Sequence, residues 1–173
     1  MTIHLDESNG MQYYLVNRLE DFEFHDADLS LIFWDDNRLI VTAKYLNIHK
    51  DAAPNNPDTD MELSEARITF CGFRIKEYIP SRTLKEDENG NFYTDEPLVI
   101  HTDSVAKEMF ENELRNKITV LEMDVDNDSY KLIADGIDPC FSVRFDFDSV
   151  RIEWKDYRGK AWYVRDSIEN ENR

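Results

Sequence analysis

The chain has 173 residues and a mass of 20.5 kDa, a length that predicts one domain spanning residues 1–173. Its 37 Asp and Glu residues outnumber its 20 Lys and Arg residues, and the net charge of −17 disfavours binding to nucleic acid or to an anionic membrane. No apolar run reaches the ~18 residues of a membrane-spanning helix, and the first residues lack the basic and apolar regions of a secretory signal. We therefore expect a cytoplasmic protein.

The first quarter of the chain is expected to contain a helix and then a β-hairpin. Apolar residues at helical spacing predict a short amphipathic helix over residues 11–22, although residues 13–16 also fit a strand. Strict alternation of apolar and polar residues then predicts strands at residues 29–33 and 39–45. The Asp-Asp-Asn sequence at residues 35–37 is typical of the turn between them.

The middle of the chain is punctuated by proline and glycine. Two prolines and paired asparagines predict a loop over residues 50–60. Alternation over residues 66–70 predicts a strand, with a bulge or a close backbone approach at Gly72 and an end at Pro80. The polar residues 81–97 contain an Asn-Gly pair and predict either a hairpin tip or a mobile loop.

The second half of the chain is expected to hold one helix among several strands. A short strand is predicted at residues 98–100, followed by an amphipathic helix whose cap is Thr102 or Asp103. Residues 118–125 and 130–134 are predicted to be strands joined by an acidic turn.

The clearest alternation lies over residues 141–147 and 150–154. The apolar residues have odd numbers in the first run and even numbers in the second. Either a bulge or a two-residue turn at residues 148–149 would restore one apolar face. A last strand is expected over residues 157–164.

These elements predict an α+β fold that is mostly antiparallel β, either a sandwich or a curled sheet, with one or two flanking helices. Ten apolar side chains are predicted to form the core. They are Phe33, Val41, Ile68, Phe70, Leu121, Leu132, Val143, Phe145, Ile152 and Trp154.

Several chemistries lack the residues that they need. The five glycines stand alone, so there is no phosphate-binding loop, and we expect no nucleotide, flavin or haem cofactor. Cys71 and Cys140 are too few for a disulfide framework or a four-thiolate zinc site, and their apolar surroundings predict structural, buried thiols.

No metal site is predicted, although two segments carry side chains that can ligate a metal. The histidines His4, His25, His49 and His101 lack helical metal-binding spacing. A carboxylate beside His25, at Asp26, leaves open a site assembled in space. The spacing of Asp124, Asp126 and Asp128 copies half of a calcium loop, but Ser129 replaces the glycine that such a loop requires, which favours a plain acidic turn.

One stretch resembles a known group of proteins. Phe24-His25-Asp26-Ala27, followed by the hairpin through Tyr45 and a strand ending in Phe70-Cys71-Gly72, resembles the opening of small uncharacterised bacterial proteins. Some of these are grouped with immunity proteins of polymorphic toxin systems. The resemblance covers about fifty residues. It implies an acidic cytosolic inhibitor that binds a toxin domain without catalysis, and it carries over no functional residues.

The charge distribution provides a functional hypothesis. Carboxylates crowd residues 1–36, 51–65 and 122–138, and the first of these segments holds nine carboxylates and one cation. If these segments converge, they form a negative patch that attracts a basic protein partner, such as the cleft of a toxin. The predicted contacts are Asp35, Asp36, Asp124, Asp126 and Asp128, at two acidic turns.

The alternative is a hydrolase-type enzyme that uses some of the scattered carboxylates. Such an enzyme needs a pair of carboxylates facing into a deep pocket of the β scaffold. The two hypotheses therefore differ in where the carboxylates point.

Overall fold

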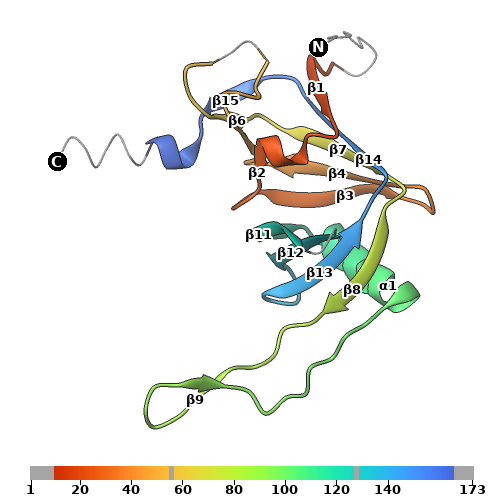
Figure 1. The fold of residues 1–173 in the computed structure, drawn as a ribbon, viewed down its shortest axis with the longest axis vertical. Helices are drawn as coiled ribbons and strands as arrows, with labels where there is room; N and C mark the ends of the chain where they lie inside the picture. The colour runs from red at the N-terminus through yellow and green to blue at the C-terminus, as the bar shows by residue number, and fades with distance from the viewer. Residues whose placement is uncertain (1–9, 55–56, 127–128, 166–173) are drawn as a thin grey trace, which may run out of the picture.

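The main element of the fold is a nine-stranded antiparallel sheet (Figure 1). The computed structural model describes residues 10–54, 57–126 and 129–165. In spatial order the strands are β1 (Tyr13–Val16), β14 (Ser149–Trp154), β7 (Ala66–Cys71), β4 (Arg38–Lys44), β3 (Asp28–Trp34), β11 (Ile118–Asp126), β12 (Ser129–Asp135), β13 (Phe141–Asp146) and β8 (Arg74–Ile79). The predicted α+β fold with mostly antiparallel strands is confirmed.

Two long strands bend so that the sheet curls over its own core. β7 continues into β8 across Gly72 and Phe73, and β13 continues into β14 across Phe147 and Asp148. The two bending strands stay side by side, because β7 pairs with β14 and β8 pairs with β13. Bends of this kind form the corners where strands pass from one half of a folded sheet to the other.

Gly72 permits this bend. Its φ of +63° lies in the left-handed region that favours glycine, and a Cβ atom at this position would collide with the carboxylate of Asp148. The close approach predicted at Gly72 is therefore confirmed. The alternative of a two-residue turn at residues 148–149 is wrong, because β13 and β14 pair with different neighbours instead of with each other.

A second sheet is built from four short strands. In spatial order they are β15 (Tyr157–Lys160), β6 (Met61–Leu63), β5 (Asn47–Ile48) and β2 (Phe22–Glu23). Residues 162–165 are helical, so the predicted strand over residues 157–164 is confirmed only for its first part. The buried carboxylate of Glu62 forms ion pairs with Arg158 at 3.0 Å and Arg165 at 2.9 Å, which hold the C-terminal segment on this sheet.

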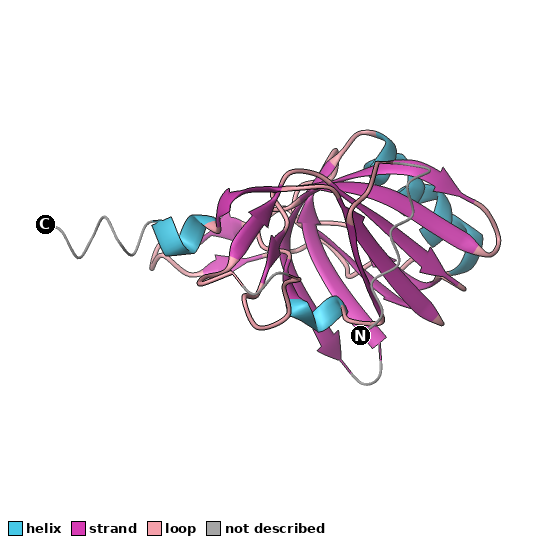
Figure 2. Cartoon of the chain, turned by 90° about the horizontal axis from the view of Figure 1, so that it is seen from above, coloured by secondary structure: helices cyan, strands magenta, loops and turns pink. Residues whose placement is uncertain are grey.

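The helix α1 (Asp103–Arg115) covers one flank of the curled sheet (Figure 2). It begins after Thr102, as predicted, and packs against β8 and β3. Ala106, Phe110 and Leu114 are buried, because their spacing places them on one side of the helix.

A buried carboxylate joins α1 to the loop after β12. Glu113 is 4% exposed and accepts hydrogen bonds from the backbone N–H groups of Ile137 at 2.7 Å and Asp138 at 3.2 Å. The hydroxyl of Tyr78 lies between the two carboxylates, 3.2 Å from Asp138 and 3.5 Å from Glu113. Burial and these two negative charges raise the pKa of Tyr78. The buried charge of Glu113 is thus balanced by donors.

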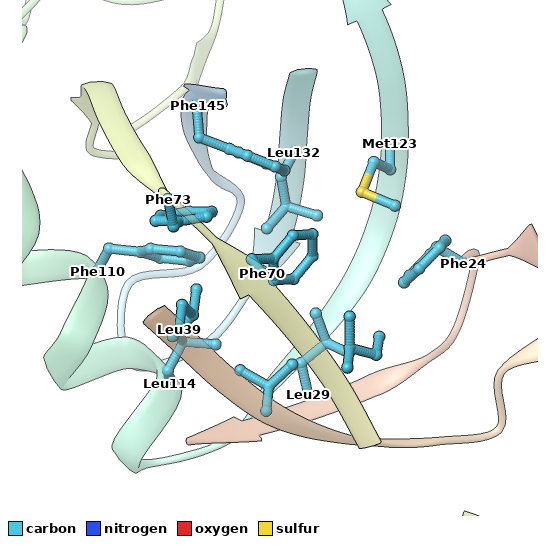
Figure 3. A pocket seen from close by; sticks show the side chains of 12 residues that line it. Phe24, Leu29, Leu39, Phe70, Phe73, Phe110, Leu114, Met123, Leu132 and Phe145 are labelled. Carbon is cyan, nitrogen blue, oxygen red and sulfur yellow. The ribbon is translucent and has the colours of Figure 1, made fainter. Parts of the chain in front are cut away.

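The interior of the curled sheet is filled by apolar side chains (Figure 3). They leave a cavity of about 20 Å³. Eight of the ten predicted core residues are buried, namely Val41, Ile68, Phe70, Leu132, Val143, Phe145, Ile152 and Trp154. Most of the ten predictions are therefore confirmed, although these eight residues are a minority of the buried apolar side chains.

The core prediction is wrong for Phe33, which is 42% exposed, and Leu121 is only half-buried. Both positions lie at register shifts in the ladders of β3 and β11. Such a bulge moves the residues that follow it to the opposite face of the sheet. Trp34 therefore points inward in place of Phe33 and packs edge-on against Phe73 and Phe110.

The predicted helix over residues 11–22 is also wrong. The alternative strand at residues 13–16 is confirmed as β1, and a short 3-10 helix, η1 (Leu19–Asp21), follows it. β1 pairs with β14 along the edge of the main sheet, with Leu15 opposite Ile152. This pairing buries Leu15 and satisfies the backbone, and it outweighs the local helical pattern.

Candidate functional site

The first predicted acidic contact is the turn between β3 and β4. The Asp35 carboxylate accepts backbone N–H bonds from Asn37 at 2.8 Å and Arg38 at 2.7 Å, and these bonds lower the pKa of Asp35. The side chain of Asp36 is 99% exposed and lies 3.6 Å from Lys107. Asp35 therefore shapes the turn, whereas Asp36 is accessible to a partner.

The second predicted contact is the turn between β11 and β12. Asp124 is exposed and lies beside Glu122, whose pKa it raises through a shared hydrogen bond and charge repulsion. The side chain of Asp126 and all of Asp128 lie outside the described residues.

The two acidic turns lie at opposite ends of the sheet. β11 meets β3 at only two residue pairs, Ile118 with Leu29 and Thr119 with Asp28, near the beginning of both strands. Since the strands are antiparallel, β3 runs from there to Asp35 while β11 runs the other way. The acidic segments at residues 1–36 and 122–138 thus do not bring their two turns together, and a role of either turn in binding stays a prediction.

The interior cavity does not supply the pair of carboxylates that the hydrolase hypothesis requires. The twelve side chains that line it are all apolar, as Figure 3 shows. Among the residues that the structure describes, two Glu side chains are buried: Glu62 pairs with cations, and Glu113 accepts backbone N–H groups. Both carboxylates therefore stabilise the fold.

The cysteines and histidines are placed as follows. Cys71 is half-buried, but Cys140 is exposed, so the prediction of two buried thiols is wrong for Cys140. Cys140 has a φ of +57° and its N–H binds Asp135, because it lies in a turn before β13 and not within the strand.

His25 is exposed and pairs with Asp26 at 3.1 Å. In the described part of the chain, no three His, Cys, Asp or Glu residues are grouped to hold a metal ion.

A feature that the charge analysis did not predict is an arm at residues 81–100, which projects from the body between β8 and α1 (Figure 1). Its outer end is a hairpin of β9 (Lys85–Glu86) and β10 (Phe92–Tyr93). Of the two alternatives predicted for residues 81–97, the hairpin tip is thus confirmed. The strand predicted at residues 98–100 is wrong, because the backbone of these residues has no ladder in the described structure and only His101 forms a bridge, with Tyr78.

The arm exposes large apolar side chains. Phe92 is 69% exposed and Leu84 is 64% exposed. Tyr93 and the run from Leu98 to Ile100 are also exposed. Exposed apolar residues are common when scattered, but a group of them on one projecting segment makes that segment a candidate interaction surface.

The polar residues of the arm hold its shape. Asp87 accepts the backbone N–H groups of Asn89 at 2.8 Å and Asn91 at 2.9 Å, which forms the tip and lowers the pKa of Asp87. Lys85 pairs with Asp95 at 2.7 Å across the two legs. The interactions that define the arm are therefore polar, and its apolar side chains remain available for contacts with another molecule.

The arm also carries negative charge. It contains five carboxylates, Glu86, Asp87, Glu88, Asp95 and Glu96, and two cations, Arg82 and Lys85. The aromatic pair at Phe92 and Tyr93 thus lies within an acidic segment. In the sequence, the signal for this site was a set of aromatic and aliphatic residues inside a polar, charged segment from which no core residue was predicted.

Comparisons of the chain with protein-family models, with curated proteins and with solved structures find no match. Within the described residues, no helix is long and apolar enough to cross a membrane. The function must therefore be argued from the geometry and charge of this chain.

Proposed function

We propose that the protein is a noncatalytic module, an inhibitor of the immunity type, that binds a basic protein partner through the arm at residues 81–100. One observation carries the proposal: the arm projects from the body and exposes Phe92, Tyr93 and Leu84 among carboxylates. The proposal includes a cytoplasmic location, where the thiols of Cys71 and Cys140 stay reduced.

The conformation of the arm supports binding to another molecule. A two-stranded hairpin alone is marginally stable in water. This hairpin has only two paired positions, Lys85 with Tyr93 and Glu86 with Phe92, and it stands away from the core. Contacts with a partner would stabilise it, because they would bury apolar side chains that the body leaves in water.

The side chains of the arm match the composition of binding hot spots. Aromatic residues in the centre of a contact supply most of the affinity, while surrounding polar residues exclude water and give specificity. Phe92 and Tyr93 are the aromatic anchors of the arm. The backbone of residues 98–100 belongs to no strand and offers further hydrogen bonds to a strand of the partner.

The charge of the chain indicates a basic partner instead of a second copy. Each copy carries a net charge of −17, so two copies repel each other, and the arm itself has more carboxylates than cations. A basic cleft is attracted to the same surface, which raises the association rate at low salt.

The test begins with a partner captured from the native host by the full chain at low salt, identified and then purified. Its affinity is measured for the wild type, for Phe92→Ala and for Phe33→Ala. Phe33 is a matched control, because it is an exposed phenylalanine on the body, 42% exposed on β3. We expect Phe92→Ala to weaken binding about thirtyfold, the size of a hot-spot residue, and Phe33→Ala to change it less than about twofold.

Salt and the oligomeric state complete the test. Raising the ionic strength from about 0.05 M to about 0.5 M should weaken binding by slowing association. The proposal would be overturned if Phe92→Ala bound the partner as tightly as the wild type. It would also be overturned if light scattering showed a wild-type dimer that Phe92→Ala converts to a monomer, because the arm would then bind a second copy.

A further inference from the structure

A second surface, separate from the arm, lies at one edge of the four-stranded sheet. His49 follows β5 and Asp60 precedes β6, and the pairing of Ile48 with Met61 makes them neighbours across the two strands. Their side chains meet, with His49 Nδ1 3.1 Å from Asp60 Oδ2. The sheet thus joins two residues that are eleven positions apart in the sequence.

The outer strands add aromatic and acidic residues to this edge. The N–H of Ala161 donates to the Asp60 carbonyl at 3.0 Å, which places Trp162 and Tyr163 beside it. On the other side, the backbone N–H of His49 donates to the carbonyl of Asp21, two residues before Glu23. Glu23 pairs with Asn47 across β2 and β5, and Asn47 is two positions before His49, so Glu23 and His49 face the same way.

The hydrogen bonds of Asp60 fix the tautomer of His49. Burial raises the pKa of Asp60, but hydrogen bonds from the Lys50 N–H at 2.9 Å, the Tyr163 hydroxyl at 2.7 Å and His49 outweigh it, so the pKa is lowered and the carboxylate stays charged. A charged carboxylate only accepts hydrogen bonds, so His49 carries its hydrogen on Nδ1. In the neutral ring, Nε2 is then an acceptor.

Two hollows of about 390 Å³ each adjoin at this edge and share Glu23 and His49 in their linings. One is walled by the rings of His25, Trp162 and Tyr163, and the other is lined by Glu20 and Asp124 among apolar residues. Three carboxylates and no Lys or Arg belong to the described lining. The groove formed by these hollows therefore combines negative charge, hydrogen-bond acceptors and aromatic faces.

We infer that this groove binds a guanidinium group, either an arginine side chain of a protein or a small free guanidinium compound. A guanidinium is planar and positively charged, presents five N–H donors and stacks on aromatic rings. Glu23 Oε1 accepts the backbone N–H of His25 at 2.8 Å, which leaves Oε2 of Glu23 as an acceptor for the ligand. Nε2 of His49 is a second acceptor when the ring is neutral. The face of Trp162 supplies the stacking surface.

The site is separate from the arm, so the two can be tested independently. The probe is Nα-acetyl-arginine methylamide. Its binding is measured by the indole N–H signal of Trp162 in a ¹H–¹⁵N spectrum. The variant Trp162→Phe lacks this signal and so assigns it. We expect a saturable shift in the millimolar range. The matching citrulline derivative, which has nearly the same shape without the charge, should bind at least about tenfold more weakly.

Substitutions test the role of the carboxylate. Glu23→Gln keeps an acceptor for the His25 N–H but removes the charge, and we expect it to weaken binding about tenfold. Glu86→Gln makes the same change on the arm and should have no effect on this site. Equal binding of arginine and citrulline derivatives, or equal binding by wild type and Glu23→Gln, would overturn the inference.

A comparison with N-propylguanidine, a free guanidinium compound with the same single charge and no peptide backbone, identifies the source of the ligand. Tighter binding of the arginine derivative supports an arginine side chain of a protein, and tighter binding of N-propylguanidine supports a small free compound. Absence of a saturable shift with both compounds would contradict the guanidinium site and would leave the arm unaffected.

Discussion

The curled sheet and the arm contain the same kinds of apolar side chain but place them differently. In the sheet, alternating residues such as Ile68 and Val143 are fully buried, whereas Phe92 and Leu98 of the arm are mostly exposed. Burial in the sheet supplies the free energy of folding. The apolar residues of the arm contribute little to that free energy, so their presence is better explained by contacts with another molecule.

The largest expected effect is the loss of a core ring from the sheet. Phe141 is fully buried and stacks on Tyr78 with ring centroids 5.2 Å apart. We expect Phe141→Ala to lower the free energy of unfolding by about 3–5 kcal/mol, measured by urea denaturation, because it removes buried area and leaves a cavity. A loss below about 1 kcal/mol would show that this side of the core is not packed as described.

A smaller loss is expected where α1 joins the sheet. Glu113→Ala would leave the backbone N–H groups of Ile137 and Asp138 without their acceptor. We expect the free energy of unfolding to fall by about 1–3 kcal/mol. Glu108→Ala, on the exposed side of the same helix, is the control and should change it by less than about 0.5 kcal/mol. Equal effects of the two substitutions would contradict a structural role for Glu113.

The four-stranded sheet of the body and the arm should also differ in their response to alkali. Burial raises the pKa of Tyr157, whose hydroxyl donates to the Pro54 carbonyl at 2.9 Å, to about 12. A raised pKa stabilises the protonated fold fully below the ordinary value of about 10, and this contribution is lost as the pH rises through the folded value.

Absorbance of ionised tyrosine measures this difference. We expect Tyr157→Phe to remove a titration step near pH 12 and to flatten the loss of stability above pH ~10. Tyr93→Phe, which removes an exposed phenol of the arm, should leave that step in place. A step near pH 12 that persists in Tyr157→Phe would mean that another phenol produces it.

The smallest effect on stability is expected in the arm. Phe92 is 69% exposed, so Phe92→Ala should change the free energy of unfolding by less than about 0.5 kcal/mol in the isolated protein. Urea denaturation of Phe92→Ala and Phe141→Ala under the same conditions compares the two losses of free energy of unfolding directly. A loss of more than about 1 kcal/mol would show that the arm packs on its own body, which would weaken the comparison between the two regions.

Alternation predicted the strands of the main sheet because each strand has one face in the core. It could not predict the bulges in β3 and β11, since one extra residue leaves the local pattern intact while reversing the faces, as at Phe33. The second sheet was also missed, because strands as short as β2 and β5 have too few residues to show a period.

The candidate sites were harder to predict than the fold. The hairpin of the arm follows from its Asn-Gly pair, but whether Phe92 is buried or exposed depends on where the arm lies relative to the body. His49 and Asp60 meet only through the pairing of β5 with β6, which no local pattern encodes. Charge was visible in the sequence, whereas its arrangement in space was not.

Hydrogen exchange of the arm, measured in the free protein and in the complex with its purified partner, tests the central claim most directly. We predict that amides of residues 94–100 exchange much faster than those of β7 in the free protein, because these residues lie beyond β10 and have no ladder, and that they become protected in the complex. Exchange in the arm that is unchanged by the partner, while the partner is bound, would contradict the account.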